Sequence, residues 1–204
     1  MTPSQYISSL REALAKVSVS DLREIEDVLF DAWRHGRTIF IAGNGGSSST
    51  ASHWTNDLNK GAITAGGRRF RAMALTDNVP LITAWGNDTA YERIFVEQMT
   101  NFIQPHDVFV AISGSGNSPN ILAAVQCARS AGAVTVGLTG RDGGQLRVLA
   151  DHAVVVPAHY MEIIEDVHLA LSHLLCTALR ARIAAPMPAG EAIPVTQTMS
   201  RPEA

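Results

Sequence analysis

Cysteine, charge and long apolar runs are all scarce in this chain of 204 residues, and each shortage excludes a class of protein. The two cysteines, Cys127 and Cys176, lie far apart in apolar segments, which excludes a zinc knuckle or a redox pair and predicts buried free thiols. Charged residues make up 17% of the chain, and the net charge is −3. Because no long run of lysine or arginine offsets that charge, we expect no nucleic-acid partner.

Membrane and export signals are missing too. No segment reaches the ~18 uninterrupted apolar residues that a membrane span requires, and residues 1–17 lack the apolar core of a signal peptide. We therefore expect a cytoplasmic protein with no membrane partner. Hydrophobic residues nevertheless make up 46% of the chain, which suits one compact domain of roughly 150 to 200 residues.

Periodicity predicts an α/β fold. Residues 1–35 carry two apolar stripes at helical spacing, and Ser20 is the expected cap of the second helix. Short apolar runs then alternate with helix-length segments such as 120–132, which predicts a parallel sheet with helices on both faces. We expect the strands to be buried on both faces, because they are almost continuously apolar. The expected strands are 38–43, 71–76, 107–113, 133–140 and 152–157.

The C-terminal part of the chain divides into two segments. A last helix is expected from about Glu162 to Ile183, with apolar residues on more than one side, as in a packed element or a subunit interface. Residues 186–204 hold four prolines and little periodicity, so we expect a disordered tail. One domain over residues 1–185 would then include the two leading helices.

Two hydroxyl-rich turns follow the first and third expected strands: "GNGGSSS" (43–49) and "SGSGNSPN" (113–120). In open α/β sheets, ligands bind where the carboxyl ends of strands meet helix N-termini, whose free amides and dipole favour anions. Ser113, Ser115 and Ser118 can donate to one phosphate. The alternative is a pair of tight loops whose serines only cap the next helix.

Neither turn is a nucleotide-binding fingerprint. The first has Ser48 where the dinucleotide motif requires its third glycine, and the second lacks the lysine that follows the P-loop glycine. We therefore expect no nucleotide cofactor, and the ligand that these turns suit is a small phosphorylated metabolite.

Four ionisable side chains lie on two of the expected helices. His53 and Asp57 are one helical turn apart, directly after the first turn, and Glu165 and His173 lie on the last helix. They could converge as acid/base pairs or as ligands of a divalent metal. A lone histidine in an apolar helix is more often a core residue. For His168, a place in the core and a functional role are about equally plausible. For His53, the position directly after the turn favours a functional role.

Six blocks of sequence together resemble the SIS (sugar isomerase) domain family, and within it most closely the phosphoheptose isomerases. The blocks are "AGNGGSSSTASHWTNDL", "ALTDN", "GNDTAYERIF", "ISGSGNSPN", "LTGRDGG" and "EIIEDVHLALSHLLC", in the family's order and spacing over residues 1 to about 183. The resemblance implies a three-layer α-β-α sandwich with a five-stranded parallel sheet, preceded by two helices. It also implies a homotetramer with sites between subunits.

The activity that the resemblance implies is aldose–ketose isomerisation. Enzymes of this family interconvert sedoheptulose 7-phosphate and D-glycero-D-manno-heptose 7-phosphate through an enediol. Asp57 and His173 stand at the positions of the catalytic pair, and some members bind zinc through residues that here become His53, Asp57, Glu165 and His173. The implied substrate-binding residues are Asn44, Ser47, Asp88, Ser113, Ser115 and Ser118.

Two site positions depart from the family, and the arginine that the family has shortly after its catalytic carboxylate is not evident here; Lys60, Arg68, Arg69 and Arg71 are the nearest candidates. Asp57 replaces a glutamate that is one methylene longer, and positioning differences on that scale matter for rate. Glu165 replaces a glutamine and so adds a negative charge, which would strengthen metal binding or raise the pKa of a neighbouring histidine. Two alternatives therefore stay open: an isomerase of a different phosphosugar, and a non-catalytic tetrameric adaptor like the SIS protein that associates with the bacterial replication initiator. An adaptor would not need the titratable set.

Overall fold

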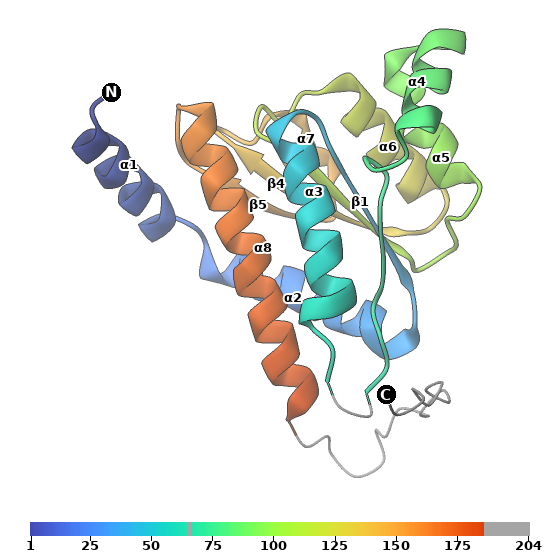
Figure 1. Ribbon diagram of the computed structural model, residues 1–204, viewed down its shortest axis with the longest axis horizontal. Coiled ribbons are helices and arrows are strands. Elements are labelled where there is room, and N and C mark those ends of the chain that lie inside the picture. Colours follow the sequence, from blue (N-terminus) through green and yellow to red (C-terminus); the bar gives the residue numbers. More distant parts are fainter. Residues whose placement is uncertain (65–66, 186–204) are drawn as a thin grey trace, which may run out of the picture.

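The computed structural model describes residues 1–64 and 67–185. Its centre is a five-stranded, all-parallel sheet with the strand order β2-β1-β3-β4-β5 (Figure 1). The strands are β1 (Thr38–Gly43), β2 (Arg71–Ala74), β3 (Val108–Ser113), β4 (Val134–Gly140) and β5 (His152–Val156). All five predicted strands are confirmed. The tail predicted for residues 186–204 lies outside the described residues.

Helices cover both faces of the sheet and form the predicted three-layer sandwich. One face packs against α1 (Pro3–Ala15), α2 (Val19–His35), α3 (Gly46–Asn56) and α8 (Met161–Ala184). The other face packs against α5 (Val96–Thr100), α6 (Pro119–Ser130) and α7 (Gly144–Leu149). Side chains alternate between the faces: in β1, Ile41 belongs to the hydrophobic core on the α3 and α8 side of the sheet, and Phe40 to the core on the α6 side.

Two local predictions were wrong, each for a physical reason. β2 is not buried on both faces, because it is an edge strand, and Met73 keeps 39% of its surface exposed. Ser20 does not cap α2. The helix begins at Val19, and Ser18 caps it by accepting a hydrogen bond from the Asp21 amide at 3.2 Å.

The cysteine prediction is confirmed for one residue of the two. Cys176 is buried, whereas Cys127 is only half-buried, and both thiols are free. Across the described ranges, no helix combines the length and the apolar character that a membrane span needs.

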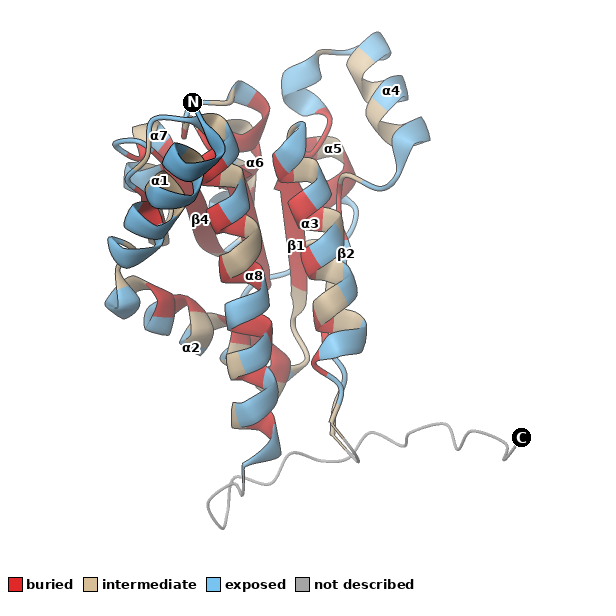
Figure 2. Ribbon diagram, turned by 60° about the vertical axis from the view of Figure 1, so that its left-hand side comes forward, coloured by how far each residue is buried: buried red, intermediate tan, exposed pale blue. Residues whose placement is uncertain are grey.

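Helix α4 (Val79–Asp88) stands apart from the rest of the molecule (Figure 2). None of its residues is buried, although its sequence, "VPLITAWGND", is largely apolar. It contacts the short 3-10 helix η2 (Tyr91–Arg93), which leads into α5. Ile82 and Trp85 pack partly against the hydrophobic core on the α5–α7 face of the sheet, whereas Val79 keeps 61% of its surface exposed. The chain itself therefore covers α4 only in part.

Helices α3 and α8 lie side by side across one face of the sheet (Figure 1). Each begins beside the carboxyl ends of the strands and runs back along the sheet. A π-helical turn, η1 (Asp57–Gly61), continues α3. Ionisable residues of the two helices can therefore meet where α3 and α8 lie side by side, and each helix N-terminus lies next to the loops that follow β1 and β3.

Candidate active site

The loop after β3 gathers three serine hydroxyls around one point. Ser113 Oγ lies 3.1 Å from Ser118 Oγ and 3.5 Å from Ser115 Oγ. Ser118 occupies the cap position of α6, yet its side chain caps no helix amide, and Pro119 follows at the first helical position. Because the Ser113 and Ser118 hydroxyls contact each other and not the helix, the purely capping interpretation does not fit this loop.

These serines line a cavity of about 140 Å³ at the carboxyl edge of the sheet. Pockets that enclose a whole small ligand typically measure ~300–1,000 Å³, so this cavity suits a phosphate-sized group. Its walls come from the loops after β1 and β3 and from the start of α8. The lining residues are Asn44, Ser47, Ile112, Ser113, Gly114, Ser115, Ser118, Met161 and Glu165.

A pair of side-chain amides fixes one wall of this cavity. Asn44 Nδ2 donates to Asn120 Oδ1 at 2.8 Å, and Asn120 Nδ2 donates back to Asn44 Oδ1 at 2.9 Å. The Tyr91 hydroxyl also donates to Asn44 Oδ1, at 3.2 Å. With its oxygen engaged twice, Asn44 keeps one N–H for a ligand, so this wall offers a donor.

Asn120 and Tyr91 were not among the predicted site residues. Asn120 closes the "SGSGNSPN" turn and Tyr91 lies within the "GNDTAYERIF" block, so both were in quoted motifs. Neither carries a signal of its own, because only the folded chain brings β1, α6 and η2 together.

Glu165 places a carboxyl group at the rim of the cavity, against the N-terminus of α3. A Cβ at Gly46 would meet this carboxylate, so a larger residue there would push the end of the Glu165 side chain aside. Burial, followed by the charges of Glu162 and Asp166, raises the pKa of Glu165 above its ordinary value. The group therefore holds its proton more strongly than an exposed glutamate does.

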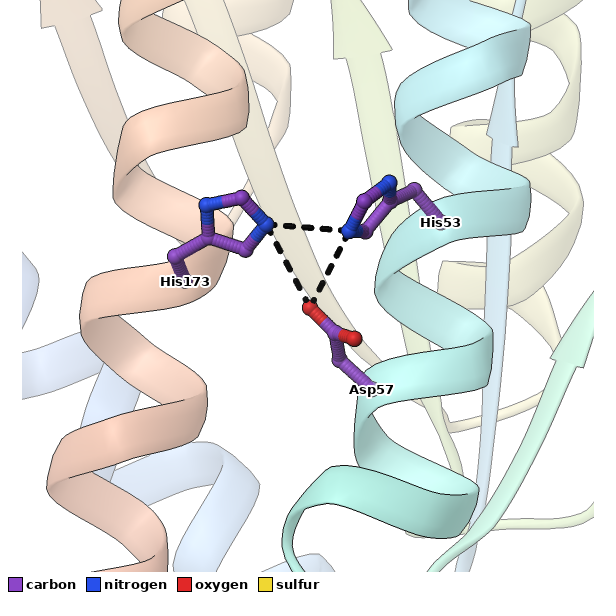
Figure 3. Close-up of side chains that lie close together, drawn as sticks. All are labelled: His53, Asp57 and His173. Atoms are coloured by element: carbon purple, nitrogen blue, oxygen red, sulfur yellow. Dashed lines mark hydrogen bonds and ion pairs between the residues drawn. The ribbon is translucent and has the colours of Figure 1, made fainter.

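A second group of ionisable residues lies further along the same two helices (Figure 3). His53 Nε2 and His173 Nε2 are 2.9 Å apart, and Asp57 Oδ2 lies 3.5 Å from the first and 3.6 Å from the second. His53 comes from α3, Asp57 from the junction of α3 with η1, and His173 from α8. The two imidazoles are about half exposed and the carboxylate is 20% exposed, so a ligand can reach all three groups.

The donor set of this cluster fits a divalent metal. Two imidazole nitrogens and one carboxylate oxygen converge within 4.8 Å of one another, the ligand type and number of catalytic zinc sites. Tetrahedral zinc with bonds of 2.0–2.2 Å separates its ligands by roughly 3.3–3.5 Å, close to the observed 2.9–3.6 Å. The same contacts also suit proton exchange between a carboxylate and an imidazole.

Aspartate at position 57 reaches both histidines in spite of its shorter side chain. Behind it, Gly61 of η1 faces Cys176 of α8, and a Cβ added at Gly61 would lie in ordinary van der Waals contact with the thiol sulfur, at 3.6 Å. The Cys176 thiol also donates to the Asp57 carbonyl oxygen at 3.4 Å.

Two predicted site residues lie away from this cluster. Glu165 is not a member of the three-residue group; it precedes His173 by two turns of α8, about 12 Å along the axis, and lines the serine cavity. Asp88 is exposed at the end of α4, where it accepts a hydrogen bond from the neighbouring Asn87 at 2.7 Å. Within one chain, Asp88 therefore does not line the serine cavity.

His168 is a core residue. It is 0% exposed, and its Nε2–H donates to the Thr139 carbonyl of β4 at 3.2 Å. Burial lowers its pKa to about 4, although the hydrogen bond to Thr139 opposes that shift. The neutral ring holds the middle of α8 against the sheet, between Glu165 and His173.

Comparison with known proteins matches the chain to one family model and to a consistent set of relatives. The model described as "SIS domain" matches residues 5–140. The phosphoheptose isomerase of Trichlorobacter lovleyi is 36% identical over 160 residues, which cover 75% of this chain and 78% of the relative. That of Akkermansia muciniphila is 35% identical over 172 residues, 84% of this chain and 90% of the relative.

Solved structures agree with the sequence matches. The phosphoheptose isomerase of Neisseria gonorrhoeae superposes with a TM-score of 0.79 at 29% identity, covering 87% of this chain and 94% of that chain. The phosphoheptose isomerase of Francisella tularensis has the same TM-score at 28% identity, covering 89% of this chain and 100% of that chain.

Proposed function

The chain belongs to the SIS domain family and, within it, to the phosphoheptose isomerases, and we propose that it interconverts sedoheptulose 7-phosphate and D-glycero-D-manno-heptose 7-phosphate through an enediol. One observation carries the proposal. A phosphate-sized cavity, lined by the serines of the loop after β3, lies at the N-termini of α3 and α8, and a cluster of acid/base groups lies further along the same two helices. A phosphorylated sugar can contact both.

The serine cavity is the proposed phosphate site. Ser113, Ser115 and Ser118 supply hydroxyl donors, and the N-terminus of α6 contributes its dipole. Asn44 and Ser47 stand beside them and are the proposed partners of the sugar hydroxyls. Glu165 at the rim would accept hydrogen bonds from the sugar and would repel a second phosphate.

The spacing of the two regions suits a seven-carbon sugar. Along α3, the rise from Gly46 beside the cavity to His53 is about 10 Å. An extended chain of seven carbons with a terminal phosphoester also spans on the order of 10 Å. With the phosphate among the serines, C1 and C2 of the sugar would lie near His53, Asp57 and His173.

Asp57 and His173 are the proposed catalytic pair. Moving a carbonyl between C2 and C1 requires one group to take a proton from carbon and return it to the neighbouring carbon. A second group must move a proton between the two oxygens. A carboxylate and an imidazole 3.6 Å apart can divide this work.

A divalent metal such as zinc is a proposed cofactor of the same cluster. His53, Asp57 and His173 would hold it, whereas Glu165, which the resemblance implies as a further ligand, lies about 12 Å along α8 from His173 and cannot share that ion within one chain. When bound, such an ion polarises a carbonyl oxygen and stabilises enediolate charge as a Lewis acid. The protein residues still have to bind the phosphate, orient the sugar and move its protons.

We further propose that the protein is a cytoplasmic homotetramer whose sites lie between subunits. Helix α4 supports this, because none of its residues is buried against its own chain (Figure 2). Asp88 lies at its exposed end. On a neighbouring subunit it could serve as the substrate-side aspartate that the resemblance predicts.

The direct test is to incubate the purified protein with sedoheptulose 7-phosphate and to follow the aldose by NMR. We expect formation of D-glycero-D-manno-heptose 7-phosphate, and no aldose from the unphosphorylated ketose. Turnover of another ketose phosphate in preference to the seven-carbon one would favour the isomerase of a different phosphosugar. No turnover of any sugar phosphate, with or without added zinc, would favour an adaptor.

A further inference from the structure

The side chain of Asn59 hydrogen-bonds to the backbone of the edge strand β2, on the side that has no neighbouring strand. Asn59 Nδ2 donates to the Ala72 carbonyl oxygen at 2.9 Å, and Asn59 Oδ1 accepts from the Ala72 amide at 3.1 Å. Edge strands present unpaired N–H and C=O groups, and a single amide satisfies one of each here. The contact joins β2 to a segment 13 residues earlier in the chain.

Asn59 belongs to the π-helical turn η1, which starts at Asp57. The Ala62 amide closes this turn by donating to the Asp57 carbonyl at 2.9 Å, and the Cys176 thiol donates to the same oxygen at 3.4 Å. π turns are rare and occur frequently at functional sites. In this chain the helical repeat changes at the residue whose carboxylate stands between the two imidazoles.

The π turn is held from both sides. Towards the sheet, Asn59 pairs with β2, and Leu58 is fully buried. Towards α8, Gly61 and the Asp57 carbonyl contact Cys176. If the Asn59 contact were lost, the burial of Leu58 and the contact with Cys176 would remain, but no hydrogen bond would tie the turn to β2, and its start could shift relative to His53 and His173.

We propose that Asn59 is a positioning residue for Asp57: by pairing with Ala72 it holds η1 in its π conformation and so places the short carboxylate between His53 and His173. This inference rests on the proposed function, in which Asp57 acts on the substrate. A shift of about an ångström can cost on the order of a hundredfold in rate. Because the aspartate side chain is one methylene shorter than that of glutamate, the position of its carboxylate depends more directly on the backbone.

The kinetic test compares Asn59→Ala with the wild-type chain on sedoheptulose 7-phosphate. We expect kcat to fall about tenfold or more, while KM stays within about twofold, because the serine cavity is untouched. Asn59→Gln keeps both amide groups and should recover part of the loss. Asn101→Ala is the matched control, since Asn101 also donates to a backbone carbonyl, that of Glu97 at 3.3 Å, but far from the site; we expect no change.

A second readout separates positioning from general damage. Hydrogen exchange of the Ala62 amide reports directly on the bond that closes the π turn. We expect it to be at least tenfold faster in Asn59→Ala, while amides of β3 stay protected. Unchanged Ala62 exchange, or faster exchange with an unaltered kcat, would overturn the inference.

The coupling between positions 57 and 59 provides the third readout. If Asn59 acts through Asp57, then Asp57→Glu and Asn59→Ala together should lower kcat by much less than the product of the two single effects. Independent, multiplying effects would contradict the inference. Full activity of Asp57→Asn would instead contradict the proposed function, and the exchange of Ala62 would still test the pairing of Asn59.

Discussion

The two regions of the candidate site are built in different ways. The serine cavity is made of loops at the edge of a buried sheet, and its polar groups already contact one another: Ser113 with Ser118, and Asn44 with Asn120. The cluster of His53, Asp57 and His173 consists of side chains on two helices, about half of each imidazole is exposed, and the turn behind it is a π-helix. The proposed phosphate-binding region is therefore preformed, whereas the geometry of the proposed reacting region depends on the spacing of two helices.

The largest expected effect comes from removing His173. We predict that His173→Ala lowers kcat by at least about a hundredfold, the usual range for an acid/base group, with little change in KM. Steady-state kinetics on sedoheptulose 7-phosphate, with circular dichroism to check the fold, measure this. Retained turnover in a folded variant would mean that the cluster is not the reacting region.

A smaller and different effect is expected from the cavity. Ser115→Ala should raise KM about tenfold to a hundredfold, because it removes one hydrogen bond to a charged phosphate, while kcat changes less. Ser130→Ala is a suitable control, since Ser130 only donates to a carbonyl of its own helix. If Ser115→Ala lowered kcat with an unchanged KM, the division between binding and reacting regions would fail.

The smallest effect concerns His168, which ties α8 to the sheet between the two regions. The pKa of His168 in the folded chain, about 4, lies below the ordinary value of 6.5. As the pH falls, the unfolded chain is therefore protonated at this histidine before the folded chain is. Stability should therefore fall as pH drops from about 6.5 to 4, by up to about 3 kcal/mol from this group alone.

Denaturant unfolding at several pH values would check this prediction against His168→Gln, which keeps a donor for Thr139 but does not titrate. The variant should lose less stability over the same pH window. If the free energy of unfolding fell equally with pH in both proteins, His168 would not be responsible for the loss of stability.

Much of the fold could be predicted from the sequence, because apolar runs and helix-length spacing determine a parallel sheet almost alone. The position of β2 at the edge of the sheet was not predicted, because the periodicity of the sequence does not indicate which strand lies outermost. At the site, the turns and the His53–Asp57 spacing were visible, since they are local patterns. The roles of Asn120 and Tyr91 and the π turn at Asp57 depend on how distant elements pack. The separation of Glu165 from His173, by contrast, follows from their spacing of two turns on one helix and could have been predicted.

Asp57, the proposed catalytic carboxylate, begins the π turn η1. Asn59 of that turn pairs with β2, and the Cys176 thiol donates to the Asp57 carbonyl oxygen at 3.4 Å. The position of the aspartate therefore depends on contacts that the backbone behind it makes with both β2 and α8.

The central claim is that one substrate contacts both regions at once. The most direct measurement is a crystal structure of the His173→Ala variant with sedoheptulose 7-phosphate bound. The account predicts the phosphate among Ser113, Ser115 and Ser118, with C1 and C2 beside Asp57 and His53. A phosphate bound elsewhere, or a sugar whose C1 and C2 point away from Asp57 and His53, would contradict it.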